Sequence, residues 1–295
     1  MRLTGTFADA RAASWGTVAL VPTMGFLHEG HLSLIRTARD AADTVLVSIF
    51  VNPLQFDRAD DLAAYPRDSH RDLELCRHAG VDVVFVPDAM EMYPTEPLTR
   101  VTVAGVADGM EGAHRPGHFA GVATVVTKLL AGLGPDRAHF GRKDAQQLAV
   151  VRTLVQDLSL PVEVVPGPTV REPDGLALSS RNVHLAGADR DRALGISRAL
   201  FAAADAAEAG ERSAEALVGV ASRAMVHAGL EPDYVALADA HTMAPLAEVE
   251  GETVLATAAA VGGVRLIDNV VLTATGPSIV ADRGTLLDEP SLLHR

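Results

Sequence analysis

The sequence predicts an α/β protein with a doubly wound parallel sheet and a second, smaller α+β domain. Short β-branched runs alternate with stretches of helical periodicity over residues 17–170, which is typical of sheets built from β-α-β units. The run TVLVSIFVN at 44–52 is mostly apolar, as expected for a strand covered on both faces. Near residue 171 the chain becomes polar and rich in turn residues. We therefore predict one domain over 1–170 and another over 171–295.

The elements of the first domain follow from the local pattern. TVALVP at 17–22 is a β-branched run that ends in proline, and GHLSLIRTARDAA at 30–42 has apolar residues at helical spacing. By the same criteria, further strands are expected at 44–52, 81–87, 137–141 and 162–170, and further helices at 69–80, 118–134 and 144–158. This order of strands and helices predicts a Rossmann-like sheet.

The second domain starts with the polar segment REPDGLALSSRN at 171–182. Two Ala-rich helices are expected at 188–209 and 213–228, followed by strands at 233–239, 253–261 and 264–272. The tail at 276–295 is rich in turn residues and is expected to be loose.

Composition limits the partners of the chain. The 295 residues carry a formal net charge of −13 at pH 7, which disfavours nonspecific binding to nucleic acid or anionic membranes. There is a single cysteine, Cys76, so no intrachain disulfide forms. The N-terminus lacks the apolar core of a signal peptide, and no apolar run is long enough to span a membrane. We expect a cytoplasmic protein with no nucleic-acid or membrane partner.

Three unusual segments leave the carboxyl ends of predicted strands. They are TMGFLHEGH at 23–31, VNPLQF at 51–56 and GRKD at 141–144. Ligands of doubly wound sheets bind at this edge, so we expect the three segments to converge on one site.

His28 and His31 lie at the start of a predicted helix with Gly30 between them. Residues three apart share a helix face, and free N–H groups at a helix N-terminus bind anions. The pattern is therefore suited to a triphosphate, and two exposed histidines at a helix start are the plain alternative. The spacing does not fit the H-E-x-x-H helix of a metalloprotease, and the P-loop pattern is absent.

Other segments offer weaker signals. Lys143 is a mobile positive charge suited to a phosphate, although a solvated surface lysine is the alternative; Asp144 and Gln147 resemble a capping box. Ser179, Ser180 and Arg181 can bind phosphate oxygens or form an ordinary polar loop.

Amides and carboxylates add further candidates. Asn52 and Gln55 follow a strand and suit a polar ligand, or close a turn before Pro53. Asp68 and Asp72 are candidate magnesium ligands but are more often helix caps.

The motifs together resemble a known family. PTMGFLHEGHLSLI resembles the H-x-G-H signature of the nucleotidyl-transferring Rossmann superfamily, which includes class I aminoacyl-tRNA synthetases, and LALSSRN resembles its second signature loop. Together with SIFVNPLQF, RPGHFAGVATVV, FGRKDAQQ and VRLIDN, they make the chain similar to the pantothenate synthetase family over about residues 15–272.

The resemblance implies a two-step reaction. D-pantoate would attack the α-phosphate of ATP to give a pantoyl adenylate and pyrophosphate, and β-alanine would then displace AMP. Donors at the α-phosphate stabilise such a transition state; these would be His28, His31, Lys143, Ser179, Ser180 and Arg181. His31 would act as acid to the leaving pyrophosphate.

The resemblance also assigns binding residues. Gln55 and Gln147, with Asn52, would hold pantoate, and Gln55 would lie near β-alanine. The ATP site would be lined by Met24, Gly25, Phe26, Leu27, His28, Glu29, Gly30, His31, Gly141, Arg142, Lys143, Asp144, Val170, Leu178, Ser179, Ser180 and Arg181. Mg²⁺ would bridge the phosphates, with Asp72 as a protein ligand. Family members are usually homodimers in which the smaller domain moves as a lid.

The chain departs from the family pattern at three positions. Arg142, Ala145 and Leu178 stand where the family often has Glu, Tyr and Met. Two other functions stay open from the residues alone: an adenylyltransferase for a different acid or phosphate ester, and a non-catalytic nucleotide-binding subunit. Neutral Gln55 and Gln147 argue against a phosphorylated substrate, and the intact set of donors argues against loss of catalysis.

Overall fold

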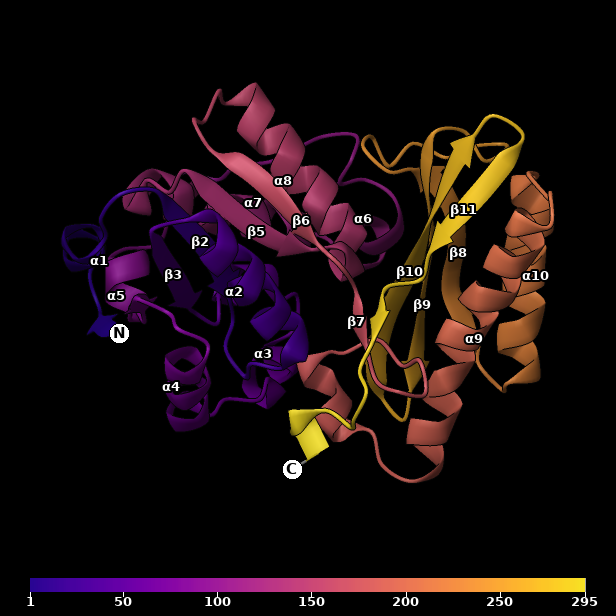
Figure 1. The fold of residues 1–295 in the computed structure, drawn as a ribbon, viewed down its shortest axis with the longest axis horizontal. Helices are drawn as coiled ribbons and strands as arrows, with labels where there is room; N and C mark the ends of the chain where they lie inside the picture. The colour runs from indigo at the N-terminus through magenta and orange to yellow at the C-terminus, as the bar shows by residue number, and fades with distance from the viewer. Residues whose placement is uncertain (295) are drawn as a thin grey trace. The chain divides into compact units, whose positions relative to one another are not determined.

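A six-stranded parallel sheet forms the centre of the N-terminal half in the computed structural model, which describes residues 1–294 (Figure 1). The strand order is β1-β4-β3-β2-β5-β6 and every pair is parallel. The strands are β1 Arg2–Thr4, β2 Val18–Thr23, β3 Thr44–Ile49, β4 Val83–Phe85, β5 Arg137–Gly141 and β6 Glu163–Gly167. The predicted doubly wound sheet is confirmed, and only the short edge strand β1 was missed.

The order of the strands locates the binding edge. From β2 the chain builds outward through β3 and β4 on one side, whereas β5 and β6 extend the sheet on the other side. In sheets of this kind the crevice for a ligand lies where the order reverses, at the carboxyl ends of the strands. Here the reversal falls between β2 and β5, so the loops after Thr23 and Gly141 flank it.

Helices pack on the sheet through apolar residues. These residues recur at helical spacing and therefore lie on one face of each helix. The helix α2 Glu29–Ala41 buries Leu34, Ile35 and Ala38 against apolar residues of β2 and β3. Cys76 lies in the same core, and burial raises the pKa of its thiol to about 12, which makes it unreactive at neutral pH. The other helices of this half are α1 Phe7–Ala13, α3 Ala59–Ala64, α4 Ser69–His78, α5 Ala89–Met92, α7 His118–Leu133 and α8 Ala145–Asp157.

An antiparallel sheet forms the C-terminal half, with strand order β11-β10-β9-β8. Its strands are β8 Pro232–Asp239, β9 Glu252–Val261, β10 Val264–Thr275 and β11 Ser278–Asp282. The helices α9 Ala188–Glu208 and α10 Ala214–His227 pack on one face of this sheet around a core rich in Ala and Leu (Figure 1). The predicted strands and both predicted helices are found within a few residues of the expected bounds.

One of the expected strands is wrong. The run at 162–170 is not continuous, because β6 ends at Gly167 between two prolines, which have no N–H to donate to a ladder. The next strand, β7 Val170–Arg171, pairs instead with β12 Thr285–Leu286.

The tail is also more ordered than expected. β11 pairs with β10 over five residues, and the side chain of Ile279 is buried in the C-terminal core. The turn residues that suggested a loose tail include a two-residue connection, Gly276–Pro277, between two paired strands.

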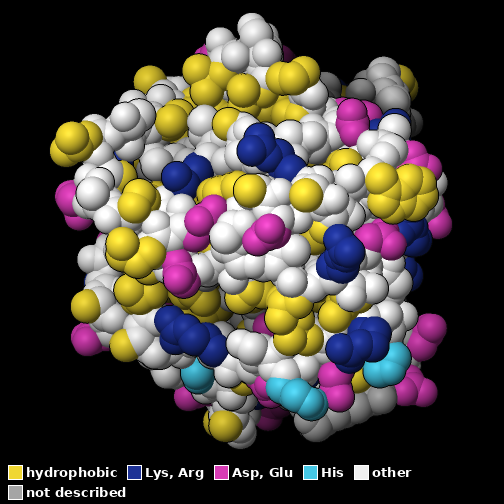
Figure 2. Space-filling model, turned by 90° about the vertical axis from the view of Figure 1, so that its left-hand side faces the viewer, with side chains coloured by type: hydrophobic (Ala, Val, Ile, Leu, Met, Phe, Trp, Pro, Cys, Tyr) yellow, Lys and Arg dark blue, Asp and Glu magenta, His cyan; other side chains and the backbone are white. Residues whose placement is uncertain are grey.

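Contacts along the chain define two units. The first contains 1–103, 115–142 and 150–167, and the second contains 104–114, 143–149 and 168–295. The second unit includes the short helix α6 Met110–His114. Within the described residues, no helix is both long and apolar enough to cross a membrane. Basic and acidic side chains are interspersed on the surface in Figure 2.

Candidate active site

The two histidines after β2 cap the helix that follows them. His28 is the N-cap of α2, and its Nδ1 accepts a hydrogen bond from the Gly30 N–H at 3.2 Å. The Nδ1 of His31 accepts one from the His28 N–H at 3.3 Å. This reciprocal arrangement is a capping box in which imidazole nitrogens replace the usual hydroxyl and carboxylate oxygens. The two ring planes are tilted by 43° to each other, with centroids 4.2 Å apart.

The capping box determines which nitrogens carry protons. A ring that accepts at Nδ1 in its neutral form carries its proton on Nε2. His28 and His31 are both held in this tautomer by backbone N–H groups. The loop therefore places two Nε2–H donors at a helix N-terminus, where backbone N–H groups and the helix dipole favour an anion.

Gly30 is required by the capping histidine. A Cβ at this position would lie 2.9 Å from His28 Cε1 and 3.0 Å from its Nδ1. The glycine therefore makes room for the His28 ring, a contact that spacing alone did not reveal.

The loop before His28 has an unusual backbone that a buried carboxylate stabilises. Gly25 and Phe26 both have positive φ, at 79° and 50°, and this region is costly for a residue with a side chain. Asp72 Oδ2 accepts the Phe26 N–H at 2.8 Å, and Oδ1 accepts the Leu27 N–H at 2.7 Å. A Cβ at Gly25 would lie 2.9 Å from Asp72 Oδ2, so glycine and aspartate fit together.

Asp72 is buried, with an exposed fraction of 1%. Burial raises the pKa of its carboxyl group, and the hydrogen bonds from Leu27 and Phe26 oppose that shift. Among the described residues, no group of three or more His, Cys, Asp or Glu side chains could hold a metal ion. That Asp72 binds Mg²⁺ therefore stays a prediction. The contacts of Asp72 show that this residue holds the loop before His28.

Asn52 and Gln55 form a buried amide cluster at the end of β3. The turn η1 Pro53–Gln55 is capped by Asn52, whose Oδ1 also accepts the hydroxyl of Tyr93 at 2.9 Å. The Asn52 Nδ2 donates to Gln55 Oε1 at 3.2 Å, and Gln55 Nε2 donates to the sulfur of Met24 at 3.0 Å. The cluster thus links the predicted substrate residues to the loop that follows β2.

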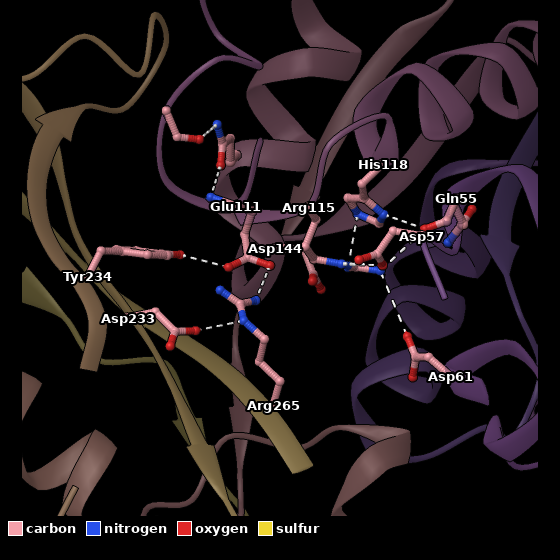
Figure 3. A network of polar contacts seen from close by, with 12 residues as sticks. Gln55, Asp57, Asp61, Glu111, Arg115, His118, Asp144, Asp233, Tyr234 and Arg265 are labelled. Carbon is pink, nitrogen blue, oxygen red and sulfur yellow. Dashed lines mark hydrogen bonds and ion pairs between the residues drawn. The ribbon is translucent and has the colours of Figure 1, made fainter. Parts of the chain in front are cut away.

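Two side chains from the RPGHF segment fix the backbone of Gln55. His118 Nδ1 lies 2.7 Å from the Gln55 carbonyl oxygen, and Arg115 Nη2 donates to the same oxygen at 3.2 Å (Figure 3). Arg115 also pairs with Asp57 at 3.7 Å and with Asp61 at 3.9 Å. Sequence reasoning missed this role, because the segment was used only for its resemblance to the family.

A glycine lets the α7 helix reach this cluster. A Cβ at Gly121 would lie 2.1 Å from the carbonyl oxygen of Leu54. Asn52 Nδ2 donates to the Gly121 carbonyl at 3.1 Å. Gly121 therefore allows close packing of α7 against η1.

Gly141 and Arg142 end a segment of the first unit, and the other remaining predicted residues lie in the second unit. Lys143 and Asp144 belong to the short turn η2 Arg142–Asp144, directly before α8. Lys143 Nζ lies 4.0 Å from Asp144 Oδ1. The Lys143 carbonyl accepts a hydrogen bond at 2.8 Å from the Nδ2 of Asn269, far along the chain.

The first turn of α8 is anchored by Gln146. Its Oε1 accepts the Glu111 N–H at 3.0 Å, and its Nε2 donates to the carbonyls of Val106 and Gly109 at 2.9 Å each. Adjacent residues on a helix point in different directions, so the half-buried Gln147 faces away from this anchor.

Glu111 is also the centre of a charged cluster on the antiparallel sheet (Figure 3). Its carboxylate accepts Arg265 Nη1 at 2.6 Å and the Tyr234 hydroxyl at 3.2 Å. Arg265 Nε donates to Asp233 at 2.8 Å. Burial and the Glu111 charge raise the pKa of Tyr234 well above its usual range, so Tyr234 is a donor at neutral pH.

The last predicted segment is a hairpin that ends in a tight turn. The Leu178 N–H donates to the Val170 carbonyl at 2.9 Å, which brings Val170 close to the signature loop. Ser179 caps the turn η3 Ser180–His184 by accepting the Arg181 N–H at 3.3 Å. Ser180 is buried, with an exposed fraction of 5%.

The structure thus gathers the predicted residues into two sets. In the first unit it brings together the 24–31 loop, Asn52, Gln55 and Asp72. In the second unit Val170 and Leu178 pair, and the carbonyl of Lys143 is held by β10.

Comparisons with known proteins support one family. The family model described as "Pantoate-beta-alanine ligase" matches residues 2–271. Pantothenate synthetase from Moorella thermoacetica is 53% identical over 258 residues, covering 87% of this chain and 91% of that protein. The enzyme of the same name from Acidothermus cellulolyticus is 51% identical over 273 residues, covering 91% of this chain and 90% of that protein.

Solved structures of the same family also resemble this chain in fold. A crystal structure of pantothenate synthetase from Thermus thermophilus has a TM-score of 0.88 and 46% identity, covering 91% of this chain and 98% of that chain. The ligase from Francisella tularensis, complexed with "Beta-gamma ATP" and beta-alanine, has a TM-score of 0.78 and 33% identity, covering 94% of this chain and all of that chain. The chain described here therefore belongs to the pantoate-beta-alanine ligase family.

Proposed function

We propose that this chain condenses D-pantoate with β-alanine at the expense of ATP and releases AMP and pyrophosphate. Family membership names the two organic substrates, and the relative from Francisella tularensis binds an ATP compound and beta-alanine. The observation in this chain that carries the proposal is the histidine capping box, which presents two Nε2–H donors at a helix N-terminus.

In the first step, a pantoate carboxylate oxygen attacks the α-phosphorus of ATP. The bond from that phosphorus to the bridging oxygen breaks, and pyrophosphate leaves. Negative charge builds up on the phosphate oxygens, and fixed N–H and O–H donors stabilise it without reorganising. We assign this role to His28 and His31, together with Lys143 and with Ser179, Ser180 and Arg181.

The capping contact favours a donor role for His31. A fully protonated ring would direct its Nδ1–H at the His28 N–H and lose the bond now measured at 3.3 Å. The neutral ring keeps that bond and donates through Nε2. The sequence-based expectation that His31 acts as an acid stays a prediction.

In the second step, the β-alanine amine attacks the acyl carbon of the adenylate. The acyl carbon–oxygen bond to AMP breaks, AMP leaves with its oxygen, and the amine releases a proton to water. Asn52 and Gln55 suit the hydroxyl and carboxylate groups of pantoate, because they offer neutral amide donors and acceptors in a buried cluster. Gln147 is assigned to the same substrate.

The remaining assignments rest on the family resemblance. The backbone of Val170 would contact adenine, with Gly141, Arg142, Asp144 and Leu178 lining the ATP site. Residues 1–170 would form the catalytic domain, and residues 171–295 would form a lid in a homodimer. The described side chains do not form a ready-made metal site, so no step is assigned to Mg²⁺, which would be carried by the phosphates with Asp72 as the candidate protein ligand.

The test is a product assay with purified protein, ATP and Mg²⁺. D-pantoate and β-alanine are added separately and together, and pyrophosphate and AMP are measured over several turnovers. We expect AMP release with repeated turnover only when both substrates are present. Bound ATP that is never consumed would favour a non-catalytic nucleotide-binding protein, and turnover with other acids would move the proposal to another substrate.

A further inference from the structure

Two adjacent residues of the VRLIDN motif, Asp268 and Asn269, have no role in the reaction described above. Both lie on β10, and both are buried, each with an exposed fraction of 4%. Successive side chains of a strand point to opposite faces of the sheet. The pair is therefore placed to contact one segment on each face of β10.

Asn269 holds the backbone of Lys143. Its Nδ2 donates to the Lys143 carbonyl oxygen at 2.8 Å, and the two residues are 126 positions apart in the sequence. Lys143 lies in the 3-10 turn Arg142–Asp144, directly before the first residue of α8, so Asn269 holds the backbone where the chain enters that helix. A hydrogen bond to this carbonyl limits rotation of the peptide unit and thereby the direction of the lysine side chain.

Asp268 holds the hairpin that leads to the signature loop. Its carboxylate pairs with Arg171 through two bonds, at 2.6 and 2.9 Å. Arg171 is fully buried and also donates to the carbonyl oxygens of Gly175 and Asn269, each at 3.1 Å. The guanidinium stacks over the ring of Phe201 at 4.9 Å. This side of β10 is thus fixed by several contacts that do not involve Asn269 Nδ2.

We propose that Asn269 is a positioning residue for adenylate formation, which acts by fixing the Lys143 carbonyl so that the ammonium group is presented to the phosphates of ATP. This inference rests on the proposed function. The inference goes beyond the proposed function because it gives one residue of the VRLIDN motif, Asn269, a role in the mechanism. The Asp268–Arg171 pair provides the rigid strand from which Asn269 reaches Lys143.

The first comparison uses Asn269→Leu, which keeps the size of the side chain and removes the donor. We measure the exchange of pyrophosphate into ATP in the presence of D-pantoate without β-alanine, because this reaction reports only the first step. We expect kcat/KM for ATP to fall by about 10-fold or more, as for a misplaced catalytic group. If Leu disturbs folding, Asn269→Asp replaces it. Aspartate has nearly the same shape as asparagine, and its carboxylate also lacks the donor.

Thr257→Val is the matched control. Thr257 lies on the neighbouring strand β9, is fully buried, and donates its hydroxyl to the Tyr234 carbonyl at 2.7 Å. The variant removes a buried side-chain bond to a backbone carbonyl, of the same kind as that of Asn269, from the same sheet. We expect it to lower the thermal midpoint and to leave pyrophosphate exchange unchanged.

A double-mutant cycle with Lys143→Met separates positioning from general destabilisation. If Asn269 acts through Lys143, adding Asn269→Leu to Lys143→Met changes exchange by less than about 2-fold, because coupled residues are not additive. The Kd for ATP, measured by calorimetry on the same four proteins, gives the same comparison if exchange by the Lys143 variant is too slow to measure.

Equal losses from Asn269→Leu in both backgrounds would overturn the inference, and so would an equal loss of exchange from Thr257→Val. Exchange by the wild-type chain that depends on D-pantoate would still support the proposed function in either case. Absence of that exchange in the wild-type chain would instead overturn the proposed function itself.

Discussion

At the scale of single residues, the side chains of the predicted site have two roles at once. The imidazoles of His28 and His31 cap α2 through Nδ1 and leave Nε2–H as the donor. Asn52 caps the turn that carries Gln55 and also holds its side chain. A change at such a residue therefore affects both stability and activity, and each experiment needs both readouts.

His31→Ala is expected to lower kcat by on the order of 10²-fold, because a fixed donor to the developing charge is lost. It should also cost about 1 kcal/mol of stability through the lost cap. Steady-state kinetics and thermal unfolding measure the two effects. His70→Ala is the control, since this histidine is 86% exposed and lies on α4. Turnover by His31→Ala at the wild-type rate would remove His31 from the catalytic set.

His139 is expected to make stability depend on pH. It lies in β5 with an exposed fraction of 1%, and neither ring nitrogen has a hydrogen-bond partner among the described residues. Burial and the charge of Arg137 lower its pKa in the folded protein. The unfolded chain binds the proton near pH 6.5, whereas the folded protein binds it only at lower pH. The free energy of unfolding should therefore fall as the pH drops below about 6.5.

His139→Leu tests this assignment. The variant should be more stable than the wild type by about 1 kcal/mol or more, because an unsatisfied buried polar group is removed. The difference should grow as the pH falls from about 7.5 to about 5.5, measured by denaturant titration. His227→Leu, on the exposed end of α10, is the control. A difference that is the same at both pH values would show that the pKa of His139 is the same in the folded and the unfolded chain.

At the scale of elements, loops and the first turns of helices carry most of the candidate site, and distant side chains hold those loops. The loop after β2 depends on Asp72 from α4. The turn after β3 depends on Arg115 and His118 from the segment that starts α7. The turn before α8 depends on Asn269 from β10. Each loop has irregular backbone groups that need a partner when buried, and each partner comes from elsewhere in the chain.

Asp72→Asn is expected to loosen the loop at 24–28. An amide has only one acceptor oxygen for the two N–H groups that Asp72 now accepts. We expect pyrophosphate exchange to fall by about 10-fold and the thermal midpoint to drop. Asp68→Asn is the matched control on the same helix, since Asn and Asp are equally good N-caps.

The same variant separates the two roles of Asp72. If the residue only holds the loop, the Mg²⁺ concentration that gives half the maximal rate stays unchanged. If Asp72 also binds Mg²⁺, that concentration rises. Wild-type stability and exchange in the variant would contradict the role in the loop.

At the scale of the whole molecule, the chain contains two units with separate cores. In the first unit, apolar residues of β2, β3 and α2 pack together. In the second, α9 and α10 pack on the antiparallel sheet. A buried ion pair, Arg171–Asp268, ties β7, near the start of the segment 168–295, to the inner strand β10.

Asp268→Ala is expected to destabilise the second unit by about 3–5 kcal/mol, because it leaves the buried Arg171 without a counter-charge. Hydrogen exchange followed by mass spectrometry should be faster in 168–294 and unchanged in β2 and β3. Glu163→Ala is the control: its pair with Arg137 is largely exposed and should contribute less than about 1 kcal/mol. Equal acceleration of exchange in both units would show that they unfold together.

The sequence by itself determined the order of strands and helices, the doubly wound sheet and the motifs of the family. These features are local, because a period of two or 3.6 residues is visible within one element. The same local view placed His28, His31 and Gln55 at the ends of strands. It failed at the 162–170 strand and at the tail, where pairing with distant strands decided the structure.

Only the tertiary structure decided what holds the candidate site in place. Asp72 looked like a cap or a metal ligand, and the structure shows its two oxygens on the backbone of the 24–28 loop. Asn269 looked like part of an unassigned motif, and the structure places it on the carbonyl of Lys143. Such contacts depend on side-chain directions and on residues far apart in the chain, and neither leaves a periodic signal in the sequence.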